Sequence, residues 1–135
     1  YADVIPLFVK KLMNHESPII NGDGMHSRDF TYIDNVIQMN ELALLTENKE
    51  ALNTVYKTAV GVRTTLNELV TLLKKYLSEY DSDIANIEIK YGPNRDGDIL
   101  HSLASVDKAE NLLFYKPIFS FQKGLKLVVN SFFSR

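Results

Sequence analysis

The segment Ser27-Arg28-Asp29-Phe30-Thr31-Tyr32-Ile33-Asp34-Asn35-Val36 decides how the rest of the chain is interpreted, because two structural patterns meet in it. Residues 28–33 are rich in aromatic and β-branched side chains, which favour an extended backbone. Asp34 can then cap a helix. We expect the inner face of this helix to carry Val36, Ile37, Asn40 and Leu44. The segment therefore predicts an extended stretch that turns directly into a helix.

The residues before this segment predict a helix, a strand and a turn. Apolar side chains recur at helical spacing from Val4 to Leu12, with two lysines on the opposite side. Pro18 ends the pattern, because the residue before a proline is pushed away from helical backbone angles. Residues 18–21 then favour a short strand, and Gly22-Asp23-Gly24 favours a tight turn.

Beyond the segment, Thr54-Val55-Tyr56 is rich in β-formers and predicts a buried strand. Thr65 and Glu68 have the spacing of a capping box, in which each side chain satisfies a free backbone amide of the other residue. This box predicts the start of a helix over 66–77, whose apolar residues fall on one face.

The last part of the chain predicts one more strand and two helices. Residues 87–91 alternate between apolar and polar, as a strand with one face in water does, and a polar loop follows over 92–98. Asp107 opens a short helix that must end before Pro117, and Ser120 caps the final helix. The predicted fold class is mixed α/β, with strands that are isolated in sequence.

The composition fits one domain and excludes several chemistries. The chain has 135 residues, 45% of them hydrophobic. Its 15 basic and 17 acidic residues give a net charge of −2, which predicts no nucleic-acid binding. The lack of cysteine excludes disulfides, thiolate metal sites and a cysteine nucleophile. With no membrane span or signal peptide we expect no membrane partner and a cytoplasmic location, and Tyr1 in place of Met suggests a piece of a longer protein.

Three features that could carry chemistry fail on spacing or context. The histidines at 15, 26 and 101 lack the spacing of a helical zinc pair, so we expect no metal site. His101-Ser102 near Asp98 lacks a nucleophile elbow, and adjacent residues rarely meet as a triad requires. Gly22-Asp23-Gly24 lacks the longer glycine pattern of a phosphate loop and is interpreted as a turn.

Two arginines in loops remain as candidate ligand residues. Arg28 follows a Gly/Ser-rich turn, and Arg95 lies in a Pro/Gly loop three residues before Asp98. Two guanidinium forks can clamp a diphosphate, and a neighbouring carboxylate can accept hydrogen bonds from ribose hydroxyls. Alternatively, the arginines pair with adjacent aspartates as surface ion pairs, which contribute only ~0–1 kcal/mol each.

Six strings, taken in order, resemble the C-terminal part of the extended short-chain dehydrogenase/reductase family of sugar-nucleotide enzymes. The strings are Val4-Ile5-Pro6, Ile20-Asn21-Gly22-Asp23-Gly24, Ser27 to Val36, Ala59-Val60-Gly61, Arg63-Thr64-Thr65-Leu66-Asn67-Glu68-Leu69, and Arg95-Asp96-Gly97-Asp98 followed by His101-Ser102-Leu103-Ala104. The turn and the Ala-Val-Gly-x-Arg-Thr string look most like the UDP-N-acetylglucosamine 4-epimerases of bacterial surface-polysaccharide synthesis.

This resemblance implies that residues 1–135 form a substrate domain for a UDP-sugar. An N-terminal Rossmann domain, absent from this chain, would bind NAD and supply the catalytic groups. The chain itself would then hold no cofactor and no catalytic residue, and alone would be inactive. Residues 54–57 would be a strand of the Rossmann sheet, so its absence would leave apolar surface exposed there. Family members commonly dimerise through Rossmann helices, so the resemblance implies a homodimeric parent and leaves the state of this chain open.

Site residues follow from the resemblance position by position. Arg28 and Arg95 match the arginines that hold the UDP diphosphate, and Asp98 matches an acid near the ribose. Three further positions, Val4, Ile19 and Asn21, match residues that wall or contact the uracil. Ser102 matches a small residue that leaves room for an N-acetyl group. The chain departs from the family at Asp3, near the uracil edge, and at Lys57-Thr58 after the strand tyrosine.

The implied activity is 4-epimerisation of UDP-N-acetylglucosamine or its uronic acid. The alternatives are a nucleotide-sugar 4,6-dehydratase, a decarboxylase or a UDP-glucose 4-epimerase, which share the UDP clamp. A non-enzymatic nucleotide-sugar binder is a further alternative.

Overall fold

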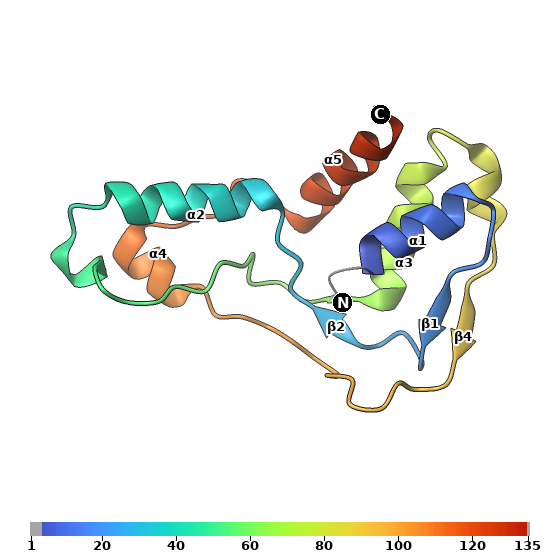
Figure 1. The fold of residues 1–135 in the computed structure, drawn as a ribbon, viewed down its shortest axis with the longest axis horizontal. Helices are drawn as coiled ribbons and strands as arrows, with labels where there is room; N and C mark the ends of the chain where they lie inside the picture. The colour runs from blue at the N-terminus through green and yellow to red at the C-terminus, as the bar shows by residue number, and fades with distance from the viewer. Residues whose placement is uncertain (1–3, 135) are drawn as a thin grey trace.

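Three helices, α1 (Val4–Met13), α3 (Leu66–Leu77) and α5 (Phe121–Phe133), enclose one apolar core in the computed structural model, which describes residues 4–134 (Figure 1). Helix α3 contacts both α1 and α5. Its residues Leu69, Leu73 and Leu77 are fully buried. The predicted helices over 4–12 and 66–77 are confirmed.

The caps predicted at Thr65 and Ser120 are present at the starts of α3 and α5. The Thr65 hydroxyl accepts a hydrogen bond from the Glu68 amide at 3.1 Å, and the Glu68 carboxylate accepts one from the Thr65 amide at 2.8 Å. The Ser120 hydroxyl accepts from the Lys123 amide at 3.2 Å. Helices leave their first amides without internal partners, so these side chains fix where α3 and α5 begin.

The strands form two small sheets. Strand β1 (Ile19–Asn21) pairs in parallel with β4 (Lys90–Gly92), and β2 (Ser27–Arg28) pairs antiparallel with β3 (Thr64–Thr65). The predicted strand over 87–91 is observed as Lys90–Gly92, because Ile87 is the C-cap of the 3-10 helix η2 (Ser82–Asn86) and the pairing with β1 begins only at Lys90. Its alternation still holds, since Ile87 and Ile89 pack against the core while Glu88 is exposed.

The predicted turn of residues 22–24 connects β1 to β2 and packs against the start of α3. Its two glycines have φ angles of +85° and +78°, which side chains disfavour. The Asn67 amide N–H donates to the Gly24 carbonyl at 3.1 Å, and the Asn67 side chain donates to the Asp23 carbonyl at 3.0 Å. A Cβ at Gly24 would lie 2.1 Å from the Asn67 side-chain oxygen, so the close approach also requires glycine.

A second group of helices lies beside the first (Figure 1). It contains α2 (Ile33–Leu45), the 3-10 helix η1 (Lys49–Ala51) and α4 (Asp107–Leu113). These elements bury a separate apolar cluster of Met39, Ala51, Ala109, Leu113 and Tyr115. The short helix predicted from Asp107 is confirmed; it ends at Leu113, and its C-cap Phe114 has a φ of 56°.

Two predictions about α2 are wrong. Tyr32 occupies the N-cap position, and Asp34 lies in the first turn. The buried residues are Asn35 and Met39, whereas Ile37 is 48% exposed and Leu44 is 83% exposed. The apolar pattern misplaced the inner face, because one of its two buried residues is a hydrogen-bonded asparagine in the first turn.

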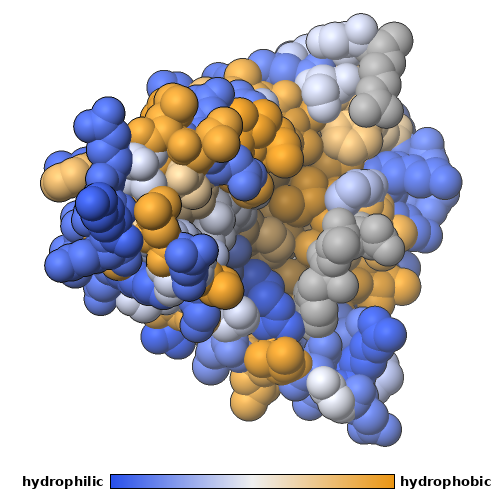
Figure 2. Space-filling model, turned by 60° about the vertical axis from the view of Figure 1, so that its left-hand side comes forward, coloured by the Kyte–Doolittle hydropathy of each residue, from blue (hydrophilic) through white to orange (hydrophobic). Residues whose placement is uncertain are grey.

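The predicted buried strand at 54–56 is also wrong for this chain. The backbone there forms no strand, and Val55 is 82% exposed. No strand of the described residues lies alongside to pair with it. The expected exposed apolar surface is therefore present at Val55. Other exposed apolar side chains surround a recess on the face shown in Figure 2. Among residues 4–134 no helix is long and apolar enough to span a bilayer.

Candidate functional site

A pocket of about 190 Å³ opens between α1, β1 and the loop after β4. It is lined by Val4, Leu7, Phe8, Ile19, Ile20, Asn21, Leu66 and Arg95. Four of these, Val4, Ile19, Asn21 and Arg95, are residues that the sequence predicted for the site. The structure therefore brings together positions that are up to 91 residues apart, which is the separation of Val4 and Arg95. Asp3 lies outside the described residues.

The strand alternation of β1 explains two of these lining residues. Ile19 and Asn21 are exposed, whereas Ile20 between them is fully buried in the core. Side chains along a strand alternate between its two faces, so Ile19 and Asn21 share the outer one. The pocket consequently has apolar walls with one amide side chain among them.

Arg95 supplies the positive charge at this pocket. It lies in an exposed loop, where the Asp98 amide donates to its carbonyl at 3.3 Å. Within the described chain, no ion pair joins Arg95 to Asp96 or Asp98. The ion-pair alternative is therefore not realised at Arg95, and its guanidinium remains available to an anion.

The N-terminus of α3 does not offer a second anion site, although Leu66 lines the pocket. The amides of Leu66 and Asn67 donate to the carbonyls of His26 and Gly24 at 3.0 and 3.1 Å. The Glu68 amide is taken by the capping box. Helix N-termini bind anions through free amides, and these three amides already have partners.

Arg28 and Ser102 both hydrogen-bond to the backbone carbonyl of Ser27, and neither residue lines the Arg95 pocket. The Ser27 carbonyl accepts from the Arg28 guanidinium Nη1 at 2.8 Å and from the Ser102 amide at 3.1 Å. Arg28 is half-buried at the end of β2, whereas Ser102 is exposed. Asp98 is half-buried in the loop between Arg95 and Ser102.

Asp29, next to Arg28, fixes the Ala59-Val60-Gly61 string. Its two carboxylate oxygens accept from the Val60 and Gly61 amides at 3.1 and 2.9 Å. The Tyr115 hydroxyl donates to the Ala59 carbonyl at 2.8 Å. Burial, and then the Asp29 charge, raise the pKa of Tyr115 and keep this hydroxyl neutral. Asp29, which precedes the string in the sequence, and Tyr115, which follows it, thus both fix the backbone of residues 59–61.

The loop that carries three of the predicted residues crosses β2. We call residues 93–105 the strap. It contains Arg95, Asp98 and Ser102, and it passes next to Arg28 at the isolated parallel bridge between Ser27 and His101. The residues predicted for the site thus form two groups, one that lines the pocket and one near Ser27, where the strap crosses β2. The strap connects the two groups.

Sequence reasoning missed two residues near this crossing. His101 bonds through Nδ1 to the Ser27 hydroxyl at 2.8 Å, and not to the adjacent serine. His26 is 5% exposed, and its Nδ1 has no hydrogen-bond partner among the described residues. No local signal marks the first contact, because Ser27 and His101 are 74 positions apart.

A larger hollow of about 500 Å³ lies between the end of α2 and α4. Glu41 and Glu47 are its only charged lining residues. This charge disfavours a diphosphate, so the hollow does not compete with the Arg95 pocket. The described residues contain no group of three or more His, Asp or Glu side chains that could hold a metal ion.

The chain belongs to the family described as GDP-mannose 4,6-dehydratase, within the extended short-chain dehydrogenases/reductases, because residues 2–128 match that family's sequence pattern. A relative in Methanocaldococcus jannaschii, named putative UDP-glucose 4-epimerase, is 33% identical over 129 residues. The match covers 96% of this chain and 38% of the relative. The chain therefore spans little more than a third of that protein's length.

Two solved structures share the fold. UDP-glucose 4-epimerase of Thermotoga maritima with UDP-glucose has a TM-score of 0.82 at 34% identity. UDP-N-acetylglucosamine 4-epimerase of Methanobrevibacter ruminantium, in complex with UDP-N-acetylmuramic acid, has a TM-score of 0.81 at 36% identity. Each match covers 97% of this chain and 39% of the solved chain. The predicted mixed fold of helices and short strands is confirmed.

A more distant structure, UDP-glucuronic acid 4-epimerase of Bacillus cereus, contains NAD. It matches at 23% identity with a TM-score of 0.76 and covers 95% of this chain and 40% of its own. The described residues of our chain do not fit NAD. A dinucleotide site needs a strand, a glycine-rich turn and a helix in succession, and the glycine turn here leads from β1 into β2.

Proposed function

We propose that this chain is the UDP-sugar-binding part of an NAD-dependent UDP-sugar 4-epimerase, acting on UDP-N-acetylglucosamine or its uronic acid. The observation that carries the proposal is the pocket that gathers Val4, Ile19, Asn21 and Arg95. An apolar slot with one amide and one guanidinium suits a pyrimidine base joined to a phosphate.

Each predicted residue has a chemical role in this proposal. Val4 and Ile19 pack against the faces of the uracil, and the Asn21 amide can both donate to and accept from its polar edge. Arg95 binds the diphosphate from the pocket side, and Arg28 binds it from β2. Asp98 accepts hydrogen bonds from ribose hydroxyls.

Ser102 would set the room around the sugar. A serine side chain is small, and the backbone amide of Ser102 shares the Ser27 carbonyl with the Arg28 guanidinium. We propose that this space accepts an N-acetyl group at C2 of the sugar. NAD and the catalytic groups would be held by the rest of a longer protein, and this chain would position the nucleotide.

A second reaction remains a candidate because the matching family is named for a 4,6-dehydratase. A 4,6-dehydratase, a decarboxylase or a UDP-glucose 4-epimerase would use the same nucleotide clamp with a different outcome at the sugar. The Arg28–Arg95 clamp therefore supports UDP-sugar binding more strongly than it supports any one of these reactions.

The product distinguishes these reactions. We would follow UDP-N-acetylglucosamine by proton NMR with the longer protein that contains this chain and catalytic NAD. A growing anomeric signal of the galacto epimer is the expected result. A keto or decarboxylated product would move the reaction to a sister enzyme, and no binding of any UDP-sugar would overturn the proposal.

A further inference from the structure

Three hydrogen bonds join the strap to Ser27 on β2. The Ser27 amide donates to the Leu100 carbonyl at 2.9 Å, and the Ser102 amide donates to the Ser27 carbonyl at 3.1 Å. The third contact joins the Ser27 hydroxyl to His101 Nδ1 at 2.8 Å.

Apolar packing contributes little to holding the strap. Its large apolar side chains, Ile99, Leu100 and Leu103, are 64%, 63% and 50% exposed. Ser27 is only 3% exposed, so its hydroxyl would lose a partner in a water-poor place if His101 moved away. The polar contacts at Ser27 therefore decide where the strap lies.

Residues proposed for the diphosphate and the sugar flank this contact on both sides. Arg28 follows Ser27 on β2, and Ser102 follows His101 on the strap. Arg95 and Asp98 lie earlier in the same strap. A shift of the strap would change the separation between Arg28 and these three residues together.

We propose that the Ser27–His101 side-chain pair is a latch that positions the strap for binding a nucleoside diphosphate. This inference rests on the proposed UDP-sugar function. Ser27 and His101 are positioning residues: they act on the ligand through Arg28, Arg95 and Ser102. Without the latch, only the two backbone hydrogen bonds hold the strap at Ser27, so the spacing of the two arginines is less fixed and the ligand must order more of the strap when it binds.

The test compares Ser27→Ala, His101→Ala and their double variant in the longer protein that contains this chain. UDP affinity is measured by calorimetry. Each single variant should weaken UDP binding about tenfold, and the double variant should be no weaker than either single one, because both remove the same contact. Ser27→Thr keeps a hydroxyl on an extended strand and should stay within about twofold of the wild type. Ser131→Ala, on the exposed side of α5, should match the wild type.

Hydrogen exchange of residues 100–102 without ligand gives an independent measurement. Ser27→Ala and His101→Ala should speed exchange at the Ser102 amide about tenfold, whereas Ser27→Thr should not. Losses that multiply in the double variant, or a Ser27→Thr variant as weak as Ser27→Ala, would overturn the latch. Unchanged exchange would overturn it even if the wild type binds no UDP, in which case the proposed function fails separately.

Discussion

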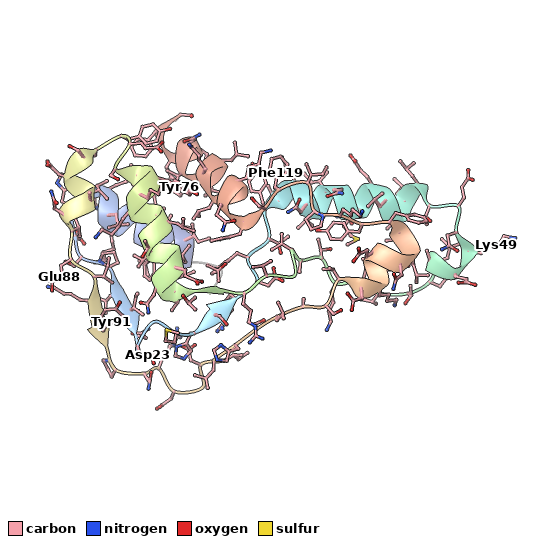
Figure 3. All side chains as sticks on the ribbon, turned by 180° about the vertical axis from the view of Figure 1, so that it is seen from behind. Asp23, Lys49, Tyr76, Glu88, Tyr91 and Phe119 are labelled. Carbon is pink, nitrogen blue, oxygen red and sulfur yellow. The ribbon has the colours of Figure 1, made fainter. Side chains whose placement is uncertain are left out.

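The side chain of Asn35 and the backbone of Phe119 share two hydrogen bonds. Asn35 Nδ2 donates to the Phe119 carbonyl at 2.8 Å, and Asn35 Oδ1 accepts from the Phe119 amide at 3.0 Å. Phe119 lies where α2 begins (Figure 3), and its ring meets that of Tyr32 edge-on with centroids 5.0 Å apart. This contact ties α2 of one helix group to the entrance of α5 in the other.

Replacing Asn35 with alanine should destabilise the chain. Asn35 is fully buried, so the change leaves two polar groups of the Phe119 backbone without partners. A buried group left unsatisfied costs about 1–3 kcal/mol. We therefore expect the free energy of unfolding to fall by about 2 kcal/mol or more, measured by urea titration. Asn40→Ala is the matched control, because Asn40 is exposed on the same helix. Equal losses for the two variants would contradict the assignment.

The capping box of α3 should be worth a measurable part of the stability. Thr65→Ala removes the hydroxyl that accepts from the Glu68 amide, which costs about 0.5–2 kcal/mol. Thr71→Ala removes the same atoms from the exposed middle of the helix and should change stability by less than about 0.5 kcal/mol. Thermal unfolding of both variants measures the difference. A Thr71 effect as large as that of Thr65 would mean that helix propensity, and not the cap, is being measured.

The stability contributed by His15 and Asp81 should depend on pH. His15 Nε2 lies 2.5 Å from Asp81 Oδ2. This hydrogen bond and the Asp81 charge raise the pKa of His15 above 6.5, and the hydrogen bond from His15 lowers the pKa of Asp81 below 3.8. The His15 contribution is complete below 6.5 and is lost as the pH rises through the raised value. The Asp81 contribution is present above 3.8 and is lost as the pH falls through the lowered value.

The pair should therefore stabilise the chain most between these limits. We expect the urea midpoint of the wild type to exceed that of His15→Gln at pH 5, and the gap to close by about pH 9. Asp81→Asn should give the same profile, because asparagine keeps the acceptor for the Asp83 amide. A gap of the same size at pH 5 and pH 9 would show that the pair contributes nothing through charge.

The arginine clamp predicts a loss of ligand affinity. Arg28→Ala and Arg95→Ala should each weaken UDP-sugar binding by about 1.5–3 kcal/mol, roughly ten- to hundredfold, for a lost charge-assisted contact. Arg63→Ala is the control, since Arg63 is exposed and does not line the Arg95 pocket. Calorimetric titration of the longer protein that contains this chain measures all three. Unchanged affinity in both clamp variants would leave these arginines as surface charges.

The size of residue 102 should control the choice of sugar. Ser102→Tyr puts a bulky ring at the position proposed to accept the N-acetyl group and should penalise UDP-N-acetylglucosamine more than UDP-glucose, by about tenfold in kcat/KM. Ser105→Tyr adds the same ring to another exposed position of the strap and should affect both sugars equally. Equal losses from Ser102→Tyr would refute the role of its volume.

Much of the local structure follows from the sequence alone. The capping box at Thr65 needs only residues three apart, so it was predictable and is present. The Ser120 cap and the helix that ends before Pro117 are also local events. The loop arginines Arg28 and Arg95 were candidates from the residues alone, whereas Ser102 became one only through the family resemblance.

Tertiary contacts decided the rest. The buried face of α2 includes Asn35 because its side chain bonds to Phe119, which lies 84 positions away. Val55 stayed exposed because a strand needs a neighbour, and no described strand lies alongside it. The pairing of Ser27 with His101 across 74 positions likewise leaves no mark in either local segment.

The sequence by itself thus determined where helices start and stop, since caps and prolines act through backbone groups a few residues apart. Only the tertiary structure decided which face of α2 is buried, where the strap crosses β2 and which predicted residues share a pocket. These depend on hydrogen bonds and packing between segments that chain folding brings together, and no periodicity within one segment encodes its distant partner.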